Sequence, residues 1–383
     1  MGRLSLHPGL GEVANWSLDE PRASTEFRLA TLRIESNERT SRALRQPLLE
    51  IELFPGSCDI SQMSKIRIVF LGTPEFAAAS LRRLIADDHF EIAAVVSQPD
   101  RPAGRKMQLK ASPVKELAIS QGLKVYTPET VNTEEFRNEI ASYGAESAAV
   151  VAFGQILGQK FLDLFPRGCV NVHGSVLPRW RGAAPIQRAI MAGDEESGVA
   201  LQVVVKKLDA GPLLGVRRVS LGDEMNAVQL HDKLKELGAD LLHVEYMDYL
   251  RGHLTPVAQD EAGVTIAPKI DKSEARIDWT KSAREIHNLV RGLAMGPLPF
   301  AVRGGQALKI LNTRVLDDGA ASGPVGTFRA VTTDGVTHLE VNCGLGLLAV
   351  ADVQPESRSR MSVADYLRGQ PATGGDRFEV GSK

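Results

Sequence analysis

Apolar runs alternate with helically spaced apolar positions along the chain from residue 66 onward. Residues 66–71 (IRIVFL) form a nearly continuous apolar run, which is typical of a buried strand, and residues 76–86 carry apolar side chains at helical spacing. The alternation continues, predicting further strands at 91–97, 125–127, 147–151, 168–172 and 200–205 and further helices at 112–121, 134–142 and 184–192. Strands that alternate with helices in this way predict an α/β domain with a doubly wound, mostly parallel sheet.

The pattern changes in the C-terminal part of the chain. Residues 226–250 predict a long amphipathic helix, 251–267 a polar linker and 283–293 a further helix. The remaining apolar runs are short and separated by Gly and Pro, at 308–311, 326–329, 335–341 and 346–353. Such short strands are typical of a small β-barrel. The predicted organisation is therefore an α/β domain at 63–252, a linker at 253–272 and a barrel domain at 273–383.

Residues 1–62 differ from the rest of the chain. They contain Arg but no Lys, few sustained apolar periods and scattered Pro and Gly, whereas a strong strand begins just after Met63. We interpret this stretch as the product of an over-called start site, with Met63 as the expected start. The alternative is a genuine, partly disordered extension. Its acidic residues disfavour a transit peptide.

Composition narrows the function classes without selecting one. The 383 residues are 43% apolar and 24% charged, with a formal net charge of −2, so nucleic-acid binding would need a local basic patch. No apolar run approaches the roughly 20 residues that span a membrane. The three cysteines (Cys58, Cys169 and Cys343) lie far apart without a CxxC motif. The apolar runs therefore predict no membrane association. The scattered cysteines favour a reducing, cytoplasmic setting and no metal site, and Cys169 is expected to be a buried apolar residue.

The candidate chemistry lies at the end of the strand predicted at 168–172. Asn171 and His173 are two residues apart, so they share one face of that strand, and Gly174 leaves room for a ligand. Asp209 follows the strand at 200–205 and could orient the imidazole. An amide N–H donor and a proton-transferring imidazole suit acyl transfer at a carbonyl carbon. Taken singly, His173 could instead be structural and Asp209 a turn residue before Gly211.

These residues and the turn between them resemble a known family. Asn171, His173 and Asp209, with the SVLP turn, are similar to the formyltransferases that use 10-formyltetrahydrofolate. The longer run SVLPRWRGAAPIQRAI resembles the methionyl-tRNA formyltransferase family in particular. Further similar segments are FLGTPEFA, QPDRPAGR, SPVKELA, ARIDW and RMSVADYLRG, so that the resemblance covers about residues 63–379.

The resemblance implies a reaction and its residues. The amino group of methionine on initiator tRNA would attack the formyl carbon of the folate donor, with Asn171, His173 and Asp209 as the catalytic residues. The folate-contacting turn would consist of Ser175, Val176, Leu177 and Pro178. The family's core is a doubly wound sheet, and its C-terminal domain is a barrel of oligonucleotide-binding type. The expected partners are initiator methionyl-tRNA and the folate donor, and the enzyme is expected to be a monomer.

Basic residues in three places are candidates for tRNA contacts. The segment 100–110 (DRPAGRKMQLK) follows the strand at 91–97, which places it at the ligand-binding edge of the sheet. It resembles the loop with which the family reaches the tRNA acceptor end, although it could also be a solvated basic loop. Trp180 is either a stacking surface or a packing residue. The candidate tRNA contacts are Arg105, Lys106, Lys110, Arg179, Arg181 and Lys269.

Departures from the family pattern leave alternatives open. Val176 replaces the usual Leu of the turn, and 292–300 (GLAMGPLPF) differs from the family's Asn-Pro-Trp-Pro run. Another folate-dependent formyltransferase, acting on an amino-sugar nucleotide or a purine precursor, is the nearest alternative. A purine enzyme's Gly-rich phosphate loop is missing, and LGTPEF lacks the GxGxxG of a nucleotide-binding regulator. An RNA-binding barrel without catalysis would leave Asn171, His173 and Asp209 unexplained.

Overall fold

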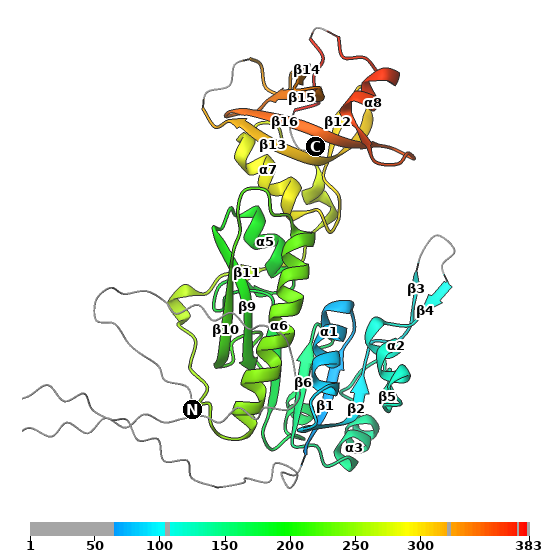
Figure 1. Ribbon diagram of the computed structural model, residues 1–383, viewed down its shortest axis with the longest axis vertical. Coiled ribbons are helices and arrows are strands. Elements are labelled where there is room, and N and C mark those ends of the chain that lie inside the picture. The colour runs from blue at the N-terminus through cyan, green and yellow to red at the C-terminus, as the bar shows by residue number, and fades with distance from the viewer. Residues whose placement is uncertain (1–64, 104–107, 320–322, 374, 381–383) are drawn as a thin grey trace, which may run out of the picture. The chain divides into compact units, whose positions relative to one another are not determined.

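The computed structural model describes residues 65–380, except 104–107, 320–322 and 374 (Figure 1). The chain divides into two units, Met1–Asp59 and Ile60–Lys383, and every described residue belongs to the second. The predictions for residues 1–62 therefore lie outside the described residues.

The N-terminal part of this unit is built on a seven-stranded sheet. Its strands, in spatial order, are β10 (Leu213–Ser220), β9 (Glu196–Val203), β7 (Cys169–His173), β6 (Ser147–Val151), β1 (Ile66–Gly72), β2 (Phe90–Val96) and β5 (Val125–Tyr126). From β7 to β5 all neighbours are parallel, and β9 is antiparallel to both β7 and β10. The predicted α/β class with a mostly parallel sheet is confirmed.

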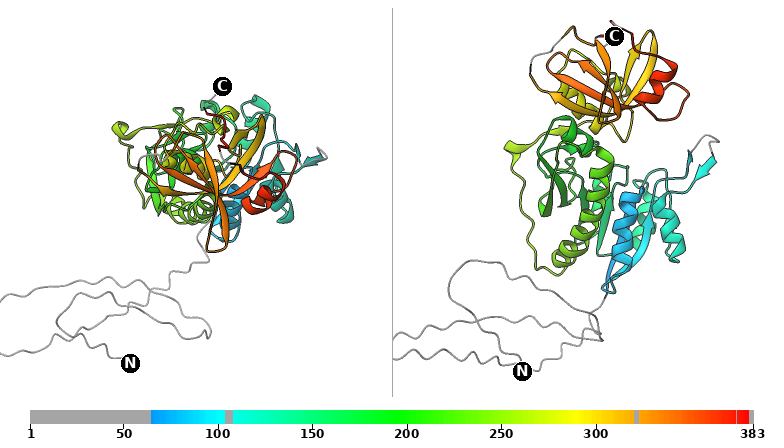
Figure 2. Two further views of the ribbon diagram at one scale, coloured as in Figure 1. Left: turned by 90° about the horizontal axis from the view of Figure 1, so that it is seen from above. Right: turned by 45° about the horizontal axis from the view of Figure 1, so that its top comes forward.

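Helices cover both faces of this sheet (Figures 1 and 2). One apolar core joins the sheet to α1 (Glu75–Ile85), α2 (Pro113–Ser120), α5 (Pro185–Met191) and α6 (Ala227–Leu250). A second core lies on the opposite face, with α3 (Glu134–Ser142) and α4 (Gln159–Leu162). Both layers follow from the alternation of side chains along each strand, which gives each face of a doubly wound sheet its own apolar surface.

Strand β7 contributes to both cores, and this fixes the direction of its polar side chains. Val170 and Val172 belong to the core with α1 and α6, whereas Cys169 belongs to the opposite core. Since side chains alternate along a strand, Asn171 and His173 lie on the face of Cys169. Cys169 is fully buried, as predicted, and its burial raises the pKa of the thiol to about 12.

Two short strand pairs lie outside the main sheet. Strands β3 (Arg101–Ala103) and β4 (Gln108–Lys110) form an antiparallel hairpin where the sequence predicted a basic loop. Strand β8 (Arg181–Gly182) pairs in parallel with β11 (Ile266–Ala267). The predicted polar linker thus returns to the segment that follows β7, and its irregular course includes the 3-10 turns Glu261–Gly263 and Lys272–Ala275.

The C-terminal part contains a six-stranded antiparallel sheet, which is consistent with the predicted small β-barrel domain. Strand β17 (Met361–Ser362) pairs with β16, and the helices are α7 (Ala283–Gly292) and α8 (Val363–Gly369). The other strands, in spatial order, are β12 (Phe300–Arg303), β13 (Gln306–Asp317), β16 (Leu347–Pro355), β15 (Val336–Asn342) and β14 (Phe328–Thr333). The core includes Trp279 stacked on Phe378 at 5.0 Å between ring centroids. Among the described residues, no helix is long and apolar enough to cross a membrane.

Candidate active site

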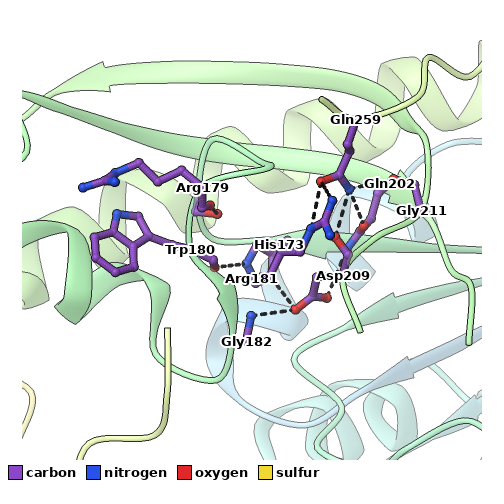
Figure 3. A network of polar contacts seen from close by, with 10 residues as sticks. His173, Arg179, Trp180, Arg181, Gly182, Gln202, Asp209, Gly211 and Gln259 are labelled. Atoms are coloured by element: carbon purple, nitrogen blue, oxygen red, sulfur yellow. Dashed lines mark hydrogen bonds and ion pairs between the residues drawn. The ribbon is translucent and has the colours of Figure 1, made fainter. Parts of the chain in front are cut away.

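His173 and Asp209 lie together at the end of β7. The imidazole Nδ1 is 3.6 Å from Asp209 Oδ2, and both side chains are largely buried, at 7% and 12% exposure (Figure 3). Asn171, which precedes His173 on the same face of β7, is half-buried and lies opposite Gln202 of β9 in the strand register. The structure therefore brings the three predicted catalytic residues to one place.

A backbone carbonyl determines which imidazole nitrogen carries the proton. The Nε2 of His173 lies 2.8 Å from the carbonyl oxygen of Trp180. Because a carbonyl oxygen only accepts, Nε2–H must donate this bond, and the neutral imidazole has its free lone pair on Nδ1. That nitrogen is the one that faces Asp209, so a proton taken up by His173 would lie beside a carboxylate.

Asp209 reaches His173 from a tight loop. Because β9 is antiparallel to β7, its last residue, Val203, pairs with Val170, and the chain must then return to reach His173. Gly211 permits this return, since a Cβ there would lie 1.6 Å from the carbonyl oxygen of Val203. Asp209 itself has a left-handed backbone, with φ of 47°, which costs energy for a non-glycine residue.

Hydrogen bonds hold both oxygens of the Asp209 carboxylate. Oδ2 accepts from the backbone N–H of Gly182 at 2.9 Å, and Oδ1 accepts from Nε2 of Gln202 at 3.1 Å. These two bonds restrict rotation of the carboxylate. The carboxylate is thus presented to His173 in a fixed orientation.

The linker supplies a residue that holds the Asp209 loop. Nε2 of Gln259 donates to the backbone carbonyls of Asp209 and Gly211, at 2.9 and 2.7 Å (Figure 3). Its Oε1 accepts from Nε and Nη2 of Arg181, at 3.1 and 2.8 Å. Since the guanidinium only donates and the carbonyls only accept, the orientation of the Gln259 amide follows from its partners.

Arg181 is an internal residue, which corrects its predicted role as a tRNA contact. Its side chain is only 2% exposed, and Nη2 also forms an ion pair with Glu261 at 3.0 Å. Hydrogen bonds from Lys207 and Arg181 hold the pKa of Glu261 below its usual range. A guanidinium that is buried and paired with Gln259 and Glu261 in this way is out of reach of a phosphate, so the structure does not support the predicted contact.

The neighbouring Arg179 and Trp180 converge on Asp194. Arg179 binds the Asp194 carboxylate with two parallel bonds, Nε to Oδ2 at 2.9 Å and Nη2 to Oδ1 at 2.6 Å. The Trp180 indole N–H donates to Oδ2 at 2.7 Å, and the guanidinium lies 4.4 Å from the indole centroid. The hydrogen bond to Asp194 raises the pKa of Arg179.

The predicted folate turn lies between His173 and this cluster. Ser175 is fully buried, and its hydroxyl donates to the carbonyl oxygen of Arg179 at 2.7 Å. Leu177 is also buried, at 3% exposure, whereas Val176 and Pro178 are half-buried, and the Leu177–Pro178 peptide is cis. Two of the four turn residues are thus only partly buried.

The remaining predicted tRNA contacts are distributed over two segments. Lys110 is exposed on β4, and Lys269 is exposed in the linker. Arg105 and Lys106 lie outside the described residues. The described part of the chain contains no group of three or more His, Cys, Asp or Glu side chains that could hold a metal ion.

Comparison with known proteins identifies the family. Residues 66–244 match the formyl transferase family model, and residues 269–371 match the model of the formyl transferase C-terminal domain. The chain is 56% identical over 321 residues to a methionyl-tRNA formyltransferase of Bdellovibrio bacteriovorus, an alignment that covers 83% of this chain and 100% of the relative. This chain belongs to the methionyl-tRNA formyltransferase family.

Other comparisons agree with this membership. A methionyl-tRNA formyltransferase of Methylococcus capsulatus is 46% identical over 310 residues, covering 81% of this chain and 98% of that relative. The solved structure of an N-formyltransferase from Helicobacter canadensis, in complex with folinic acid and dTDP-3-aminofucose, matches 76% of this chain and 99% of its own. Its TM-score of 0.56 at 18% identity shows a shared fold.

Several residues around the catalytic candidates gave no signal in the sequence. Gln202, Gln259 and Asp194 are ordinary polar residues in segments that were interpreted as a strand, a linker and a region after a helix. Their partners are 7 to 78 positions away in sequence. The pairing of β9 with β7 places Gln202 at the site, whereas the packing of the linker and of the α5 end against the segment after β7 places Gln259 and Asp194.

Proposed function

We propose that this protein transfers a formyl group from 10-formyltetrahydrofolate to the amino group of methionine on initiator tRNA. The observation that carries the proposal is the pairing of His173 with Asp209, 3.6 Å apart on the face of β7 that also bears Asn171. This arrangement occurs in a chain that aligns with the whole of a methionyl-tRNA formyltransferase at 56% identity.

Asn171 is proposed to stabilise the oxygen of the reacting carbonyl. When the methionine amine attacks the formyl carbon, a new C–N bond forms and the carbonyl oxygen becomes negatively charged. The amide N–H of Asn171 would donate to this oxygen. Loss of one such donor typically lowers kcat by about 10²–10³-fold.

His173 is proposed to move the proton between the two nitrogens. The attacking nitrogen must lose a proton, and N10 of the folate must gain one as its bond to the formyl carbon breaks. Nδ1 is the imidazole nitrogen with a free lone pair, because Nε2–H donates to Trp180. Asp209, 3.6 Å from Nδ1, would stabilise the imidazolium that forms between the two transfers.

The turn and the exposed basic residues are proposed to bind the two substrates. Ser175, Val176, Leu177 and Pro178 would form one wall of the folate site, since they follow His173 directly. Exposed cations suit phosphate contacts because these contacts depend on charge rather than on a buried geometry. Lys110, Arg179 and Lys269 are exposed and are proposed to contact tRNA, and the same role is proposed for Arg105 and Lys106, which lie outside the described residues.

The cellular setting and the domain boundaries are parts of the same proposal. A cytoplasmic monomer would meet initiator methionyl-tRNA and the folate donor directly, without a metal ion. Residues 63–252 would form the catalytic domain, 253–272 the linker and 273–383 the tRNA-binding domain. The matched segments 66–244 and 269–371 are compatible with these boundaries.

A transfer assay tests the proposal. The purified full-length protein would receive 10-formyltetrahydrofolate carrying a labelled formyl group, together with methionyl initiator tRNA, methionyl elongator tRNA or dTDP-3-aminofucose in parallel reactions. We expect rapid labelling of the initiator tRNA, with much lower kcat/KM for the elongator tRNA. Labelling of the amino sugar without labelling of either tRNA would overturn the proposal.

A further inference from the structure

The run Arg179–Arg181 has a role beyond contact with a substrate. We propose that Asp194 is a positioning residue for His173 and acts on it through Arg179 and Trp180. This inference rests on the proposed function of His173 as the proton carrier.

Asp194 anchors two consecutive side chains at once. Its carboxylate is 15% exposed, binds Arg179 with two bonds at 2.6 and 2.9 Å, and accepts the indole N–H of Trp180 at 2.7 Å. The anchor is itself fixed, because the backbone N–H of Asp194 donates to the carbonyl oxygen of Ala189 at the end of α5. Three donors on one partly buried carboxylate hold the two side chains in a defined position.

The backbone of Trp180 is held as firmly as its ring. Its N–H donates to Oγ1 of Thr265 at 2.9 Å, and its carbonyl oxygen accepts from Nε2 of His173 at 2.8 Å. Trp180 has a φ of 64°, a left-handed conformation that is unfavourable for a bulky residue. Such conformations persist where surrounding contacts enforce them, and they cluster at functional sites.

This arrangement transmits the position of Asp194 to the imidazole. Figure 3 shows the indole and the Arg179 guanidinium together on the side away from His173, whereas the Trp180 carbonyl points at the imidazole. Asp194 thus holds the indole ring outside the site, and hydrogen bonds to Thr265 and His173 hold the Trp180 peptide inside it. If the bond to Asp194 is lost, the carbonyl can leave Nε2, and the imidazole loses the contact that fixes both its rotation and its tautomer.

The proposal gives Arg179 a role beyond phosphate contact, and enzyme kinetics distinguish the two roles. A residue that binds tRNA phosphate affects KM for tRNA, because it stabilises the bound substrate and the transition state alike. A residue that orients His173 affects kcat, because a displaced proton carrier serves the transition state poorly. Asp194 is itself an anion and does not bind phosphate, so an effect of its substitution on kcat would identify it as a positioning residue.

Asp194→Asn is the decisive variant, since it removes the charge and keeps the size of the side chain. Asp240→Asn is the matched control, because Asp240 forms an exposed ion pair with Arg83 on the outer helices. We expect Asp194→Asn to lower kcat by about ten- to hundredfold, with KM for initiator tRNA unchanged or lower. The control should leave both constants within twofold of those of the wild type.

A spectroscopic measurement reads the positioning directly. With ¹⁵N-labelled histidine, the wild-type His173 should show a single tautomer with the proton on Nε2, and Asp194→Asn should show a mixture. Trp180→Phe keeps an aromatic ring but removes the N–H bond to Asp194, and it should give a smaller change in the same direction. If Asp194→Asn does not fold, Trp180→Phe still tests whether the bond to Asp194 positions the imidazole of His173.

The outcomes distinguish the inference from the proposed function. If the wild-type protein transfers no formyl group, the proposed function fails, while the tautomer comparison still tests the positioning of His173. If the wild type is active and Asp194→Asn retains the wild-type kcat and a single Nε2–H tautomer, the inference is overturned. A rise in KM for tRNA with unchanged kcat would also overturn it, because it would show a role in tRNA binding alone.

Discussion

The end of β7 and the β3–β4 hairpin both carry residues proposed for the reaction, yet the protein builds them in opposite ways. At β7 the side chains of His173 and Asp209 are largely buried and their polar atoms meet specific partners. In the hairpin, the residues of β4 are exposed, and Lys110 projects from a strand of only three residues.

Polar contacts hold the base of the hairpin. Nζ of Lys115 pairs with the Asp100 carboxylate at 2.8 and 2.9 Å, and the hydroxyls of Ser97 and Ser112 are 2.6 Å apart. Proton transfer needs atoms placed to within fractions of an ångström, whereas contact with a phosphate needs charge within reach. The residues proposed for proton transfer are therefore largely buried, whereas Lys110, which is proposed for tRNA contact, is exposed.

The largest expected effect comes from removing a side chain of the buried site at the end of β7. His173→Ala should lower kcat by about 10²–10⁴-fold, because it removes the proton carrier. Its melting temperature should stay near that of the wild type. His253→Ala, at an exposed histidine, serves as the control. Formyl-transfer kinetics within twofold of the wild type for His173→Ala would remove the residue from the mechanism.

A second substitution, at a residue outside substrate contact, tests the same buried site at the end of β7. Gln259→Ala removes the amide that holds the Asp209 loop, and we expect kcat to fall by about ten- to hundredfold with little change in KM for tRNA. The matched control is Gln354→Ala, which removes a side-chain bond to the Arg358 carbonyl in the C-terminal sheet. Equal kcat for the two variants would show that the Asp209 loop holds its shape without Gln259.

The basic residues of 100–110 should affect the affinity for tRNA and its dependence on salt concentration. Neutralising Arg105 and Lys110 together as Gln should raise KM for initiator tRNA several-fold at low salt and leave kcat at saturating tRNA close to that of the wild type. Each lost phosphate contact should reduce the slope of log affinity against log salt by about one. Lys235→Gln on α6 is the control. A fall in kcat without a change in the salt slope would contradict the assignment of the hairpin to tRNA.

The smallest expected effect concerns a buried histidine outside the proposed site. His287 donates from Nε2 to the Asp223 carbonyl and lies 2.9 Å from Oγ1 of Thr313. Burial, with smaller contributions from neighbouring charges, lowers its pKa below the ordinary 6.5. The unfolded chain therefore binds the proton more readily, and stability falls as pH drops below about 6.5, by at most about 1.4 kcal/mol per pH unit.

Denaturant unfolding at several pH values measures this effect. The wild type should lose more stability between about pH 7 and pH 5 than His287→Gln, while kcat at neutral pH stays similar for both. An identical pH dependence of unfolding in the two proteins would show that His287 does not contribute. The result distinguishes the burial of His287, which affects stability, from the burial of His173, which is proposed to serve catalysis.

Much of the fold followed from the sequence because its central strands are continuous apolar runs. Strand β10 was missed, since its run LLGVRRVS contains two arginines at the edge of the sheet. Residues 101–110 were expected as a loop, because each hairpin strand has only three residues. Helix α4 has only four residues, which is too short for a periodic signal, and helix α8 was not predicted either.

The candidate site was predictable where its residues share one segment. Asn171 and His173 are linked by the two-residue repeat of a strand, and Asp209 was found from its resemblance and its strand-end position. The burial of Arg181 was not predictable, because it depends on Gln259, which is 78 positions away. Strand order and linker packing determine such contacts, and neither leaves a local pattern.

The central claim is that Asp209 supports proton transfer by His173 during formyl transfer to methionyl initiator tRNA. The most direct measurement is the single-turnover rate of transfer by the wild type and by Asp209→Asn, with enzyme in excess and both substrates bound. The substitution keeps the shape of the side chain and removes the charge that would stabilise the imidazolium. The account predicts a rate at least about 10²-fold lower for Asp209→Asn. Equal single-turnover rates for the two proteins would contradict it.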